Sequence, residues 1–304
     1  MSIIFMGTPE FAVASLQALL DAGEKIVAVV TAPDKPAGRG QKIHESAVKK
    51  FALANHLPVL QPTNLKDPDF IKQLENFKAD LQVVVAFRML PEIVWNMPPK
   101  GTINLHASLL PQYRGAAPIN HAIINGETET GVSTFLLQHE IDTGNVLFSE
   151  KTSILPNDTA EDLHDKLMNI GAQLLVKTVS SIYRGQVEGI PQSENNEQLK
   201  TAPKIHKEDC RINWDRSVQE VYNLIRGLSP YPTAFTLLDN KILKIYKAKP
   251  EFTQVNEIPG TPLSDGKTYL KFACKNGYIH IQDLQIQDKK RMGISDFLRG
   301  FRLK

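Results

Sequence analysis

Short runs of Val and Ile that alternate with amphipathic segments constrain the first half of this chain more than any other feature. Residues Ser2–Met6, Lys25–Thr31 and Leu81–Phe87 are mostly apolar, as strands of a parallel sheet are when helices cover both faces. Segments with helical spacing, such as Phe11–Ala22 and Pro68–Asn76, lie between these runs. The pattern therefore predicts a Rossmann-like α/β domain.

The same alternation continues up to residue 184. The further predicted strands are Pro58–Gln61, Thr102–His106, Gly131–Leu137 and Val146–Lys151, and the further predicted helices are Ser46–Asn55, Pro118–Ile124 and Thr159–Tyr183. Asp158 is the expected N-cap of the last helix, because Asp is a preferred cap residue and an acidic first turn follows it. Residues 185–205 lose this periodicity and gather glycine, proline and asparagine, which predicts a linker.

The last hundred residues have a different pattern. Short alternating segments are separated by turn pairs such as Asp265-Gly266 and Asn276-Gly277, which favour antiparallel hairpins. The predicted strands are Thr233–Leu238, Ile242–Ala248, Lys267–Cys274 and Tyr278–Leu284, and the one predicted helix is Val218–Arg226. We therefore expect a Rossmann-like domain over 1–184, a linker over 185–205 and a smaller, OB-like antiparallel β-barrel over 206–304.

Charge is distributed unevenly between these two predicted domains. Residues 1–200 carry 17 basic and 22 acidic side chains, a net charge of −5, whereas residues 201–304 carry 18 and 11, a net charge of +7. A basic domain attracts a polyanion, although a surface kept basic for solubility is the simpler explanation. The split itself favours a domain boundary.

The composition excludes several classes of protein. Two cysteines, Cys210 and Cys274, provide neither a disulfide framework nor a four-thiolate zinc site. The apolar runs are far shorter than the roughly 18 residues of a membrane span. The first run meets Gly7 too soon for a signal peptide. We expect a soluble, cytoplasmic protein with no membrane partner and, since no apolar heptad or long edge strand demands a partner, a monomer.

The motifs that bind nucleotides and metals do not occur in this sequence. The first predicted strand ends at Gly7-Thr8-Pro9, which has one glycine where a dinucleotide site has G-x-G-x-x-G, and Pro9 has no backbone N–H for a phosphate. None of the eight histidines stands in an H-x-x-x-H or H-E-x-x-H arrangement. The sequence therefore predicts no metal.

Polar residues at the end of one predicted strand are candidates for catalysis. Asn104 and His106 are two residues apart, so they project from the same face at the carboxyl end of Thr102–His106, where ligands of open α/β sheets bind. An amide and an imidazole can stabilise an oxyanion. Asp142, in Asp142-Thr143-Gly144, can orient the imidazole or accept a proton. For each motif alone, a polar strand end or a common loop is the better explanation.

Together, these motifs give the chain a specific resemblance. It resembles the bacterial-type methionyl-tRNA formyltransferases, within the folate-dependent formyltransferase family, over nearly its whole length. The motifs that carry the resemblance are Phe5-Met6-Gly7-Thr8-Pro9-Glu10-Phe11, Gly38-Arg39-Gly40, the block Asn104–Pro118, Asp142-Thr143-Gly144, Ala202-Pro203-Lys204-Ile205, Ser229-Pro230-Tyr231-Pro232 and Asp296-Phe297-Leu298-Arg299-Gly300.

The resemblance implies transfer of a formyl group from 10-formyltetrahydrofolate to the α-amine of methionine on initiator tRNA. It implies catalytic roles for Asn104, His106 and Asp142. It also implies that folate is bound by Ser108, Leu109, Leu110 and Pro111, and that no metal takes part.

The resemblance further implies how tRNA is held. The loop Ala32–Glu45 carries Lys35, Arg39 and Lys42, and the corresponding loop of the family enters the acceptor stem. A solvated connector is the alternative for any basic loop. The basic C-terminal domain is expected to contact tRNA phosphates.

Three other functions are compatible with parts of the pattern. A glycinamide ribonucleotide formyltransferase has the same catalytic trio but no basic C-terminal β-domain. A formyltransferase acting on an amino-sugar nucleotide is similar in length but lacks this form of the Gly-Arg-Gly loop. A non-catalytic tRNA-binding protein on the same fold would not need the intact trio.

Arg88 departs from the family pattern, and we expect it to form a surface salt bridge or to contact the acidic tail of the folate.

Overall fold

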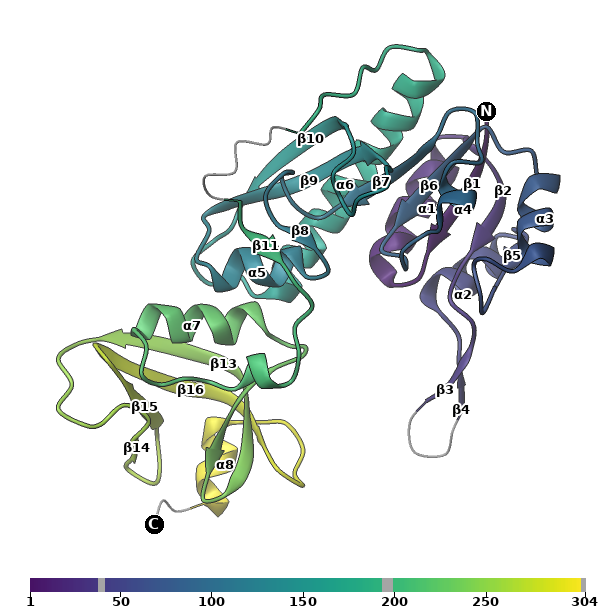
Figure 1. The fold of residues 1–304 in the computed structure, drawn as a ribbon. Coiled ribbons are helices and arrows are strands. Elements are labelled where there is room, and N and C mark those ends of the chain that lie inside the picture. Colours follow the sequence, from purple (N-terminus) through teal and green to yellow (C-terminus); the bar gives the residue numbers. More distant parts are fainter. Residues whose placement is uncertain (38–41, 193–198, 302–304) are drawn as a thin grey trace. The chain divides into compact units, whose positions relative to one another are not determined.

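The computed structural model describes residues 1–37, 42–192 and 199–301, and these form two compact units (Figure 1). The first unit comprises Met1–Gly115, Thr130–Thr152 and His164–Thr201; the second comprises Ala116–Glu129, Ser153–Leu163 and Ala202–Lys304. Two excursions of the chain before residue 184 therefore belong to the second unit, because the units follow packing rather than chain order. The boundaries proposed from the sequence stay a prediction.

The first unit is built around a seven-stranded sheet with the strand order β10-β9-β7-β6-β1-β2-β5. Its elements are β1 (Ser2–Gly7), α1 (Glu10–Asp21), β2 (Lys25–Val30), β3 (Lys35–Ala37), β4 (Lys42–His44), α2 (Ala47–Ala54), β5 (Val59–Leu60), α3 (Pro68–Asn76), β6 (Leu81–Val85), α4 (Glu92–Trp95), β7 (Thr102–His106), β8 (Arg114–Gly115), β9 (Glu129–Leu136), β10 (Val146–Ser153) and α6 (Ala160–Tyr183). Strands from β7 to β5 pair in parallel, and β9 pairs antiparallel with β7. The predicted Rossmann-like α/β class is confirmed.

Continuous burial explains why the apolar runs form central strands. Ile3, Ile4, Phe5 and Met6 of β1 are all at most 1% exposed, so both faces of this strand are covered. Gly7 ends the strand where a Cβ would lie 2.6 Å from the Cβ of Ala12 and 2.9 Å from a backbone oxygen of β6. Glycine is therefore required there for α1 to pack close to the sheet.

Two predictions about where elements begin or end are wrong. The strand predicted over Leu81–Phe87 ends at Val85, because Ala86 has φ +47°, a left-handed conformation that cannot continue the pleat. The N-cap of α6 is Thr159 rather than Asp158: the Thr159 hydroxyl accepts from the Asp162 N–H at 3.2 Å, and the Asp162 carboxylate accepts from the Thr159 N–H at 2.9 Å. Asp158 instead accepts from the Leu155 N–H.

The second unit contains a six-stranded antiparallel sheet and three α-helices among its described residues. Its elements are α5 (Pro118–Ile124), the 3-10 helix Glu208–Cys210, α7 (Val218–Gly227), β12 (Ala234–Leu238), β13 (Lys241–Phe252), β14 (Pro262–Ser264), β15 (Leu270–Cys274), β16 (Gly277–Ile286), β17 (Met292–Gly293) and α8 (Ile294–Gly300), and β11 (Thr201–Ala202) contains the point where the chain passes between units. The strand order is β12-β13-β16-β15-β14, with β17 also on β16. Register shifts around Lys247 bend the long strand β13. The resulting curled sheet confirms the OB-like prediction (Figure 1).

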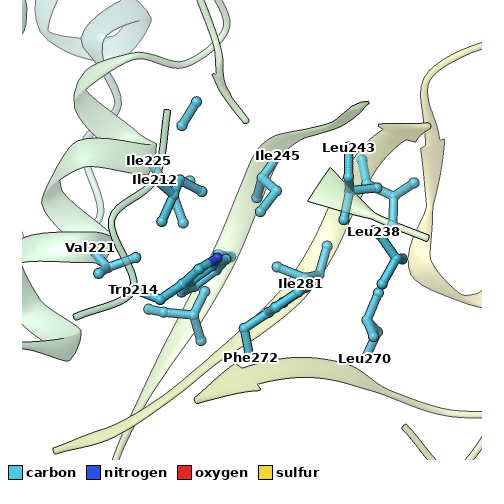
Figure 2. Packing of buried hydrophobic residues seen from close by; sticks show 14 of the residues in the cluster. Ile212, Trp214, Val221, Ile225, Leu238, Leu243, Ile245, Leu270, Phe272 and Ile281 are labelled. Carbon is cyan, nitrogen blue, oxygen red and sulfur yellow. The ribbon is translucent and has the colours of Figure 1, made fainter. Parts of the chain in front are cut away.

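The core of the second unit lies between α7 and the concave face of this sheet (Figure 2). Trp214 and Phe272 stack there with ring centroids 4.6 Å apart and an interplanar angle of 7°. The indole N–H of Trp214 donates to the Thr236 hydroxyl at 3.0 Å, so burial of the indole leaves no polar group unpaired. This unit therefore has a hydrophobic core of its own.

Sequence periodicity missed one helix of this unit. Within residues 206–304 only Val218–Arg226 is predicted as an α-helix, whereas Ile294–Gly300 also forms one, α8. This helix has only seven residues, which is too short for a helical repeat of apolar residues to stand out in the sequence. Phe297 and Leu298 of α8 are nonetheless buried in the core, so tertiary packing stabilises this short helix.

Across the described residues, no helix combines the length and the apolar character that crossing a membrane requires.

We predict that Phe272→Ala lowers the free energy of unfolding of the second unit by about 3–5 kcal/mol, because it removes a ring that is 1% exposed and leaves a cavity. Phe252, which is 62% exposed at the end of β13, provides the matched control. Phe252→Ala should change the free energy by less than about 0.5 kcal/mol. Urea unfolding followed by circular dichroism measures both, and equal losses would contradict this account of the core.

Candidate active site

Strand β7 brings the two predicted strand-end residues to the carboxyl edge of the sheet. Val85 of β6 pairs with Leu105 and with Gly7 of β1, so His106 lies just beyond the last paired rung of three parallel strands. Asn104 is half-buried, and its side-chain amide has no hydrogen-bond partner among the described residues. The amide is thus available to a ligand at this edge.

His106 is buried and has a defined orientation. Its Nε2 lies 2.9 Å from the carbonyl oxygen of Tyr113. A carbonyl can only accept, so Nε2 carries the proton of the neutral ring and Nδ1 has the lone pair. Nδ1 faces Asp142, whose Oδ2 lies 3.9 Å away. The predicted trio is therefore partly assembled: the imidazole and the carboxylate face one another, and Asn104 lies on the same strand as His106.

Asp142 occupies a tight turn after β9. Its φ of +55° lies in the left-handed region, and its Oδ2 accepts the backbone N–H of Gly115 at 3.0 Å. The nearby Gly144 lies against β9: a Cβ at this position would be only 1.6 Å from the carbonyl oxygen of Leu136. The glycine predicted from Asp-Thr-Gly is thus needed for the close approach of two backbones.

Two further residues of the site were not predicted from the sequence. The side-chain amide of Gln192 donates to the carbonyl oxygens of Asp142 and Gly144, at 2.8 Å each. Its oxygen accepts from Arg114, at 3.0 Å from Nε and 2.6 Å from the terminal nitrogen. Gln192 falls in the segment predicted as a linker, and no spacing or motif distinguishes it there. Arg114 lies in the block Asn104–Pro118, which carries the family resemblance. A charged guanidinium in that block was the only signal in the sequence that Arg114 has a polar partner in the site.

The predicted folate-binding residues form a compact turn after β7. The Ser108 hydroxyl donates to the carbonyl oxygen of Gln112 at 2.6 Å, and the Gln112 N–H donates to the carbonyl oxygen of Leu109 at 3.0 Å. Ser133 of β9 links both ends, since its hydroxyl donates to the Ser108 carbonyl oxygen and accepts the Leu110 N–H. Leu109, Leu110 and Pro111 are half-buried beside this turn. Their role in binding stays a prediction.

Two of the three predicted tRNA-contacting residues, Lys35 and Lys42, begin the paired strands β3 and β4, where the sequence had predicted a loop (Figure 1). Lys35 is exposed on β3 and pairs in register with His44. Arg39 lies outside the described residues, and only the backbone of Lys42 is described. Their role in tRNA binding stays a prediction.

The base of the hairpin is fixed by Lys49 of α2. Its ammonium lies 2.5 Å from the Asp34 carboxylate and 2.8 Å from that of Glu45, on the two sides of the hairpin. The hydrogen bond from Lys49 holds the pKa of the Asp34 carboxyl below its ordinary value. Lys49 therefore clamps the two ends of the hairpin together.

Among the described residues, Arg88 forms hydrogen bonds to backbone carbonyl oxygens in place of the predicted surface salt bridge. In the described part of the chain, its guanidinium donates to the carbonyl oxygens of Pro62 and Thr63. Burial lowers the pKa of this guanidinium. The side chain thus ties the loop after β6 to the loop after β5, because carbonyl oxygens on the neighbouring loop offer two acceptors to one planar donor group.

The charged and polar side chains of this edge include Asn104, His106 and Asp142. Among residues 1–37, 42–192 and 199–301, no three His, Cys, Asp or Glu side chains form a group that could hold a metal ion. An unpartnered amide, an oriented imidazole and a carboxylate can together stabilise a developing oxyanion and move a proton.

We predict that Gly144→Ala destabilises the first unit by about 1–3 kcal/mol or more, because the added methyl group overlaps the Leu136 carbonyl and the turn must shift. Gly300→Ala is the control, since a Cβ there meets no atom within 4 Å. Thermal unfolding compares the two variants. Equal stability of both would show that the turn is not held against β9.

Known protein families and sequences match nearly the whole chain. The model of the family described as "Formyl transferase" matches residues 1–179, and that of "Formyl transferase, C-terminal domain" matches residues 204–302. A methionyl-tRNA formyltransferase of Bacteroides fragilis is 52% identical over 99% of this chain and 95% of its own length. One from Flavobacterium johnsoniae is 52% identical over 98% of this chain and 95% of its own.

Solved structures share the fold at lower identity. HypX from Aquifex aeolicus, in complex with tetrahydrofolic acid, has a TM-score of 0.67 at 19% identity over 99% of this chain, which spans about half (48%) of that protein. WlaRD, a sugar 3N-formyl transferase, has a TM-score of 0.65 at 23% identity, over 95% of this chain and 99% of its own. The family models and the closely similar sequences together show that the chain belongs to the formyl transferase family, and within it to the methionyl-tRNA formyltransferases.

Proposed function

We propose that this protein transfers the formyl group of 10-formyltetrahydrofolate to the α-amine of methionine on initiator tRNA, giving N-formylmethionyl-tRNA for translation initiation. The observation that carries the chemical part of this proposal is the placement of Asn104, His106 and Asp142 at one edge of the sheet, with His106 Nδ1 and Asp142 Oδ2 3.9 Å apart. The acceptor is supported by the relatives named as methionyl-tRNA formyltransferases.

A folate donor fits the residues at this edge. The unpartnered Asn104 amide is a donor without an acceptor inside the described protein, and the half-buried Leu109, Leu110 and Pro111 offer apolar surface in the turn that follows β7. Solved neighbours were crystallised with tetrahydrofolic acid and with 5-N-formyl-THF. When bound, the formylated folate supplies an electrophilic carbonyl carbon.

We further propose that the enzyme is a cytoplasmic monomer that uses no metal.

The three polar residues have distinct roles in this proposal. The neutral amine attacks the formyl carbon, and negative charge develops on the formyl oxygen. Asn104 donates its amide N–H to that oxygen, a contact that is stronger in the transition state than in the ground state. His106 keeps its Nε2 proton on Tyr113 and carries a second proton on Nδ1, which also stabilises the oxyanion. Asp142 stabilises the resulting imidazolium and assists transfer of the proton that the amine loses to the folate nitrogen. The bond between the formyl carbon and this nitrogen then breaks, the carbonyl forms again, and tetrahydrofolate leaves.

One assay separates the candidate functions. The protein is incubated with 10-formyltetrahydrofolate and, in parallel, with methionyl-tRNA, glycinamide ribonucleotide or an amino-sugar nucleotide. Formylation of methionyl-tRNA is expected. Formylation of either small acceptor in its place would overturn the proposed acceptor, and binding of tRNA without any formylation would indicate a non-catalytic protein.

We predict that Asn104→Ala lowers kcat for formylation roughly a hundredfold to a thousandfold, because one oxyanion donor is lost. Asn55→Ala removes the same amide from an exposed position at the end of α2 and should leave kcat unchanged. Steady-state kinetics measure both. Wild-type turnover of Asn104→Ala would defeat the assignment of Asn104.

We predict that Arg39→Ala weakens use of tRNA far more than binding of folate, since the basic loop is proposed to contact phosphates. The KM for methionyl-tRNA should rise, and its dependence on salt should become less steep. Lys25→Ala removes the same charge at the start of β2, at the opposite edge of the sheet, and is the control. An equal effect of Arg39→Ala on both substrates would indicate a structural role for the loop.

A further inference from the structure

The segment 189–192 packs against the start of β10, the strand that follows the Asp142 turn. Ile190 exchanges two backbone hydrogen bonds with Val146 of β10, at 2.8 and 2.9 Å. A Cβ on Gly189 would lie 2.7 Å from the Cβ of Asn145, so these two backbones are also close together. The end of the segment, Gln192, is thereby held next to residues 142–144.

Every hydrogen-bonding position of the Gln192 amide lies against protein. Its nitrogen donates to the carbonyl oxygens of Asp142 and Gly144, and its oxygen accepts two N–H groups of Arg114. A guanidinium can only donate, so Arg114 determines which end of the amide faces it. The nitrogen must then face the two carbonyl oxygens. Gln192 is therefore oriented by Arg114 and has no group left for a substrate.

The two carbonyl oxygens that Gln192 binds flank the strained part of the turn. Asp142 has φ +55°, which for a residue other than glycine is stable only when its surroundings hold it. Gly115, the residue after Arg114, binds the Asp142 carboxylate through its N–H at 3.0 Å. The backbone of Asp142 is thus held through Gln192 and its side chain through Gly115, and both contacts converge on β8.

We propose that Gln192, oriented by Arg114, is a positioning residue that holds the backbone of residues 142–144 so that the Asp142 carboxylate faces His106 Nδ1. This inference rests on the proposed function, in which Asp142 acts through His106. It makes the segment 189–192 part of the active site, although the segment contributes no group to the reaction.

The test uses two variants of the full chain. Gln192→Ala removes all four hydrogen bonds. Gln192→Glu has the same shape and still accepts from Arg114, but it cannot donate to the carbonyl oxygens of Asp142 and Gly144. Both variants should lower kcat for formylation about tenfold to a hundredfold, as expected for a catalytic group that moves by about 1 Å. KM for methionyl-tRNA and for the folate should change less than about threefold, because the hydrogen bonds of the Gln192 amide all go to protein groups.

The decisive measurement combines these variants with Asp142→Ala. If Gln192 acts only through Asp142, Gln192→Ala should cost less than about threefold in the Asp142→Ala background, since its target is already absent. An equal loss in both backgrounds would overturn the proposal, and so would an unchanged kcat or a loss confined to KM. Gln186→Ala, at an exposed position of the same segment, is the control and should match the wild type.

A crystal structure of Gln192→Ala gives a result that does not depend on the acceptor. The expected result is a turn that has left φ +55° at Asp142 and has lost its hydrogen bond to Gly115. An unchanged turn overturns the positioning role. If the wild-type protein does not formylate methionyl-tRNA, the proposed function fails, and the crystal structure still decides the role of Gln192.

Discussion

The contact between two backbones, that of Gly144 and that of Leu136, is the constraint on which the site depends. A side chain at 144 would overlap the Leu136 carbonyl, and the Leu136 N–H donates to the Asn145 carbonyl oxygen at 3.0 Å. In this turn beside β9, Asp142 adopts a left-handed conformation with φ +55°. The carboxylate is thereby turned toward β7, where His106 lies. The orientation of the Asp142 carboxylate thus depends on the absence of a side chain at Gly144.

Such a turn needs support from distant parts of the chain. Gln192 binds its carbonyl oxygens, Arg114 orients Gln192, and Gly115 binds the Asp142 carboxylate. These contacts join residues that are 27, 48, 50 and 78 positions apart along the chain. Each contact satisfies a polar group that is partly removed from water, where an unpaired group would be costly. The same bonds that stabilise the edge of the sheet therefore orient its proposed catalytic carboxylate.

The second unit is stabilised in a different way. Its stability comes from apolar contacts between α7 and a curled antiparallel sheet, with the stacked pair Trp214 and Phe272 at the centre (Figure 2). Because that core is independent, the outer surface is free to carry charge. Residues 201–304 have a net charge of +7, which suits the proposed contact with tRNA phosphates. The segments Ala116–Glu129 and Ser153–Leu163 of the same unit are acidic, so the excess of positive charge belongs to the C-terminal part of the chain and not to the unit as a whole.

Local patterns in the sequence determined most elements: Pro68–Asn76, Thr102–His106 and Pro118–Ile124 begin and end where predicted. They also determined Asn104, His106 and Asp142 as candidates, because alternation on a strand and a glycine turn are local. Tertiary structure alone decided that Thr159 rather than Asp158 caps α6, that α8 forms, and that Gln192 reaches the Asp142 turn. Periodicity reports which face of an element is buried. It contains no information about which distant donor meets which acceptor, since that depends on how the whole chain packs.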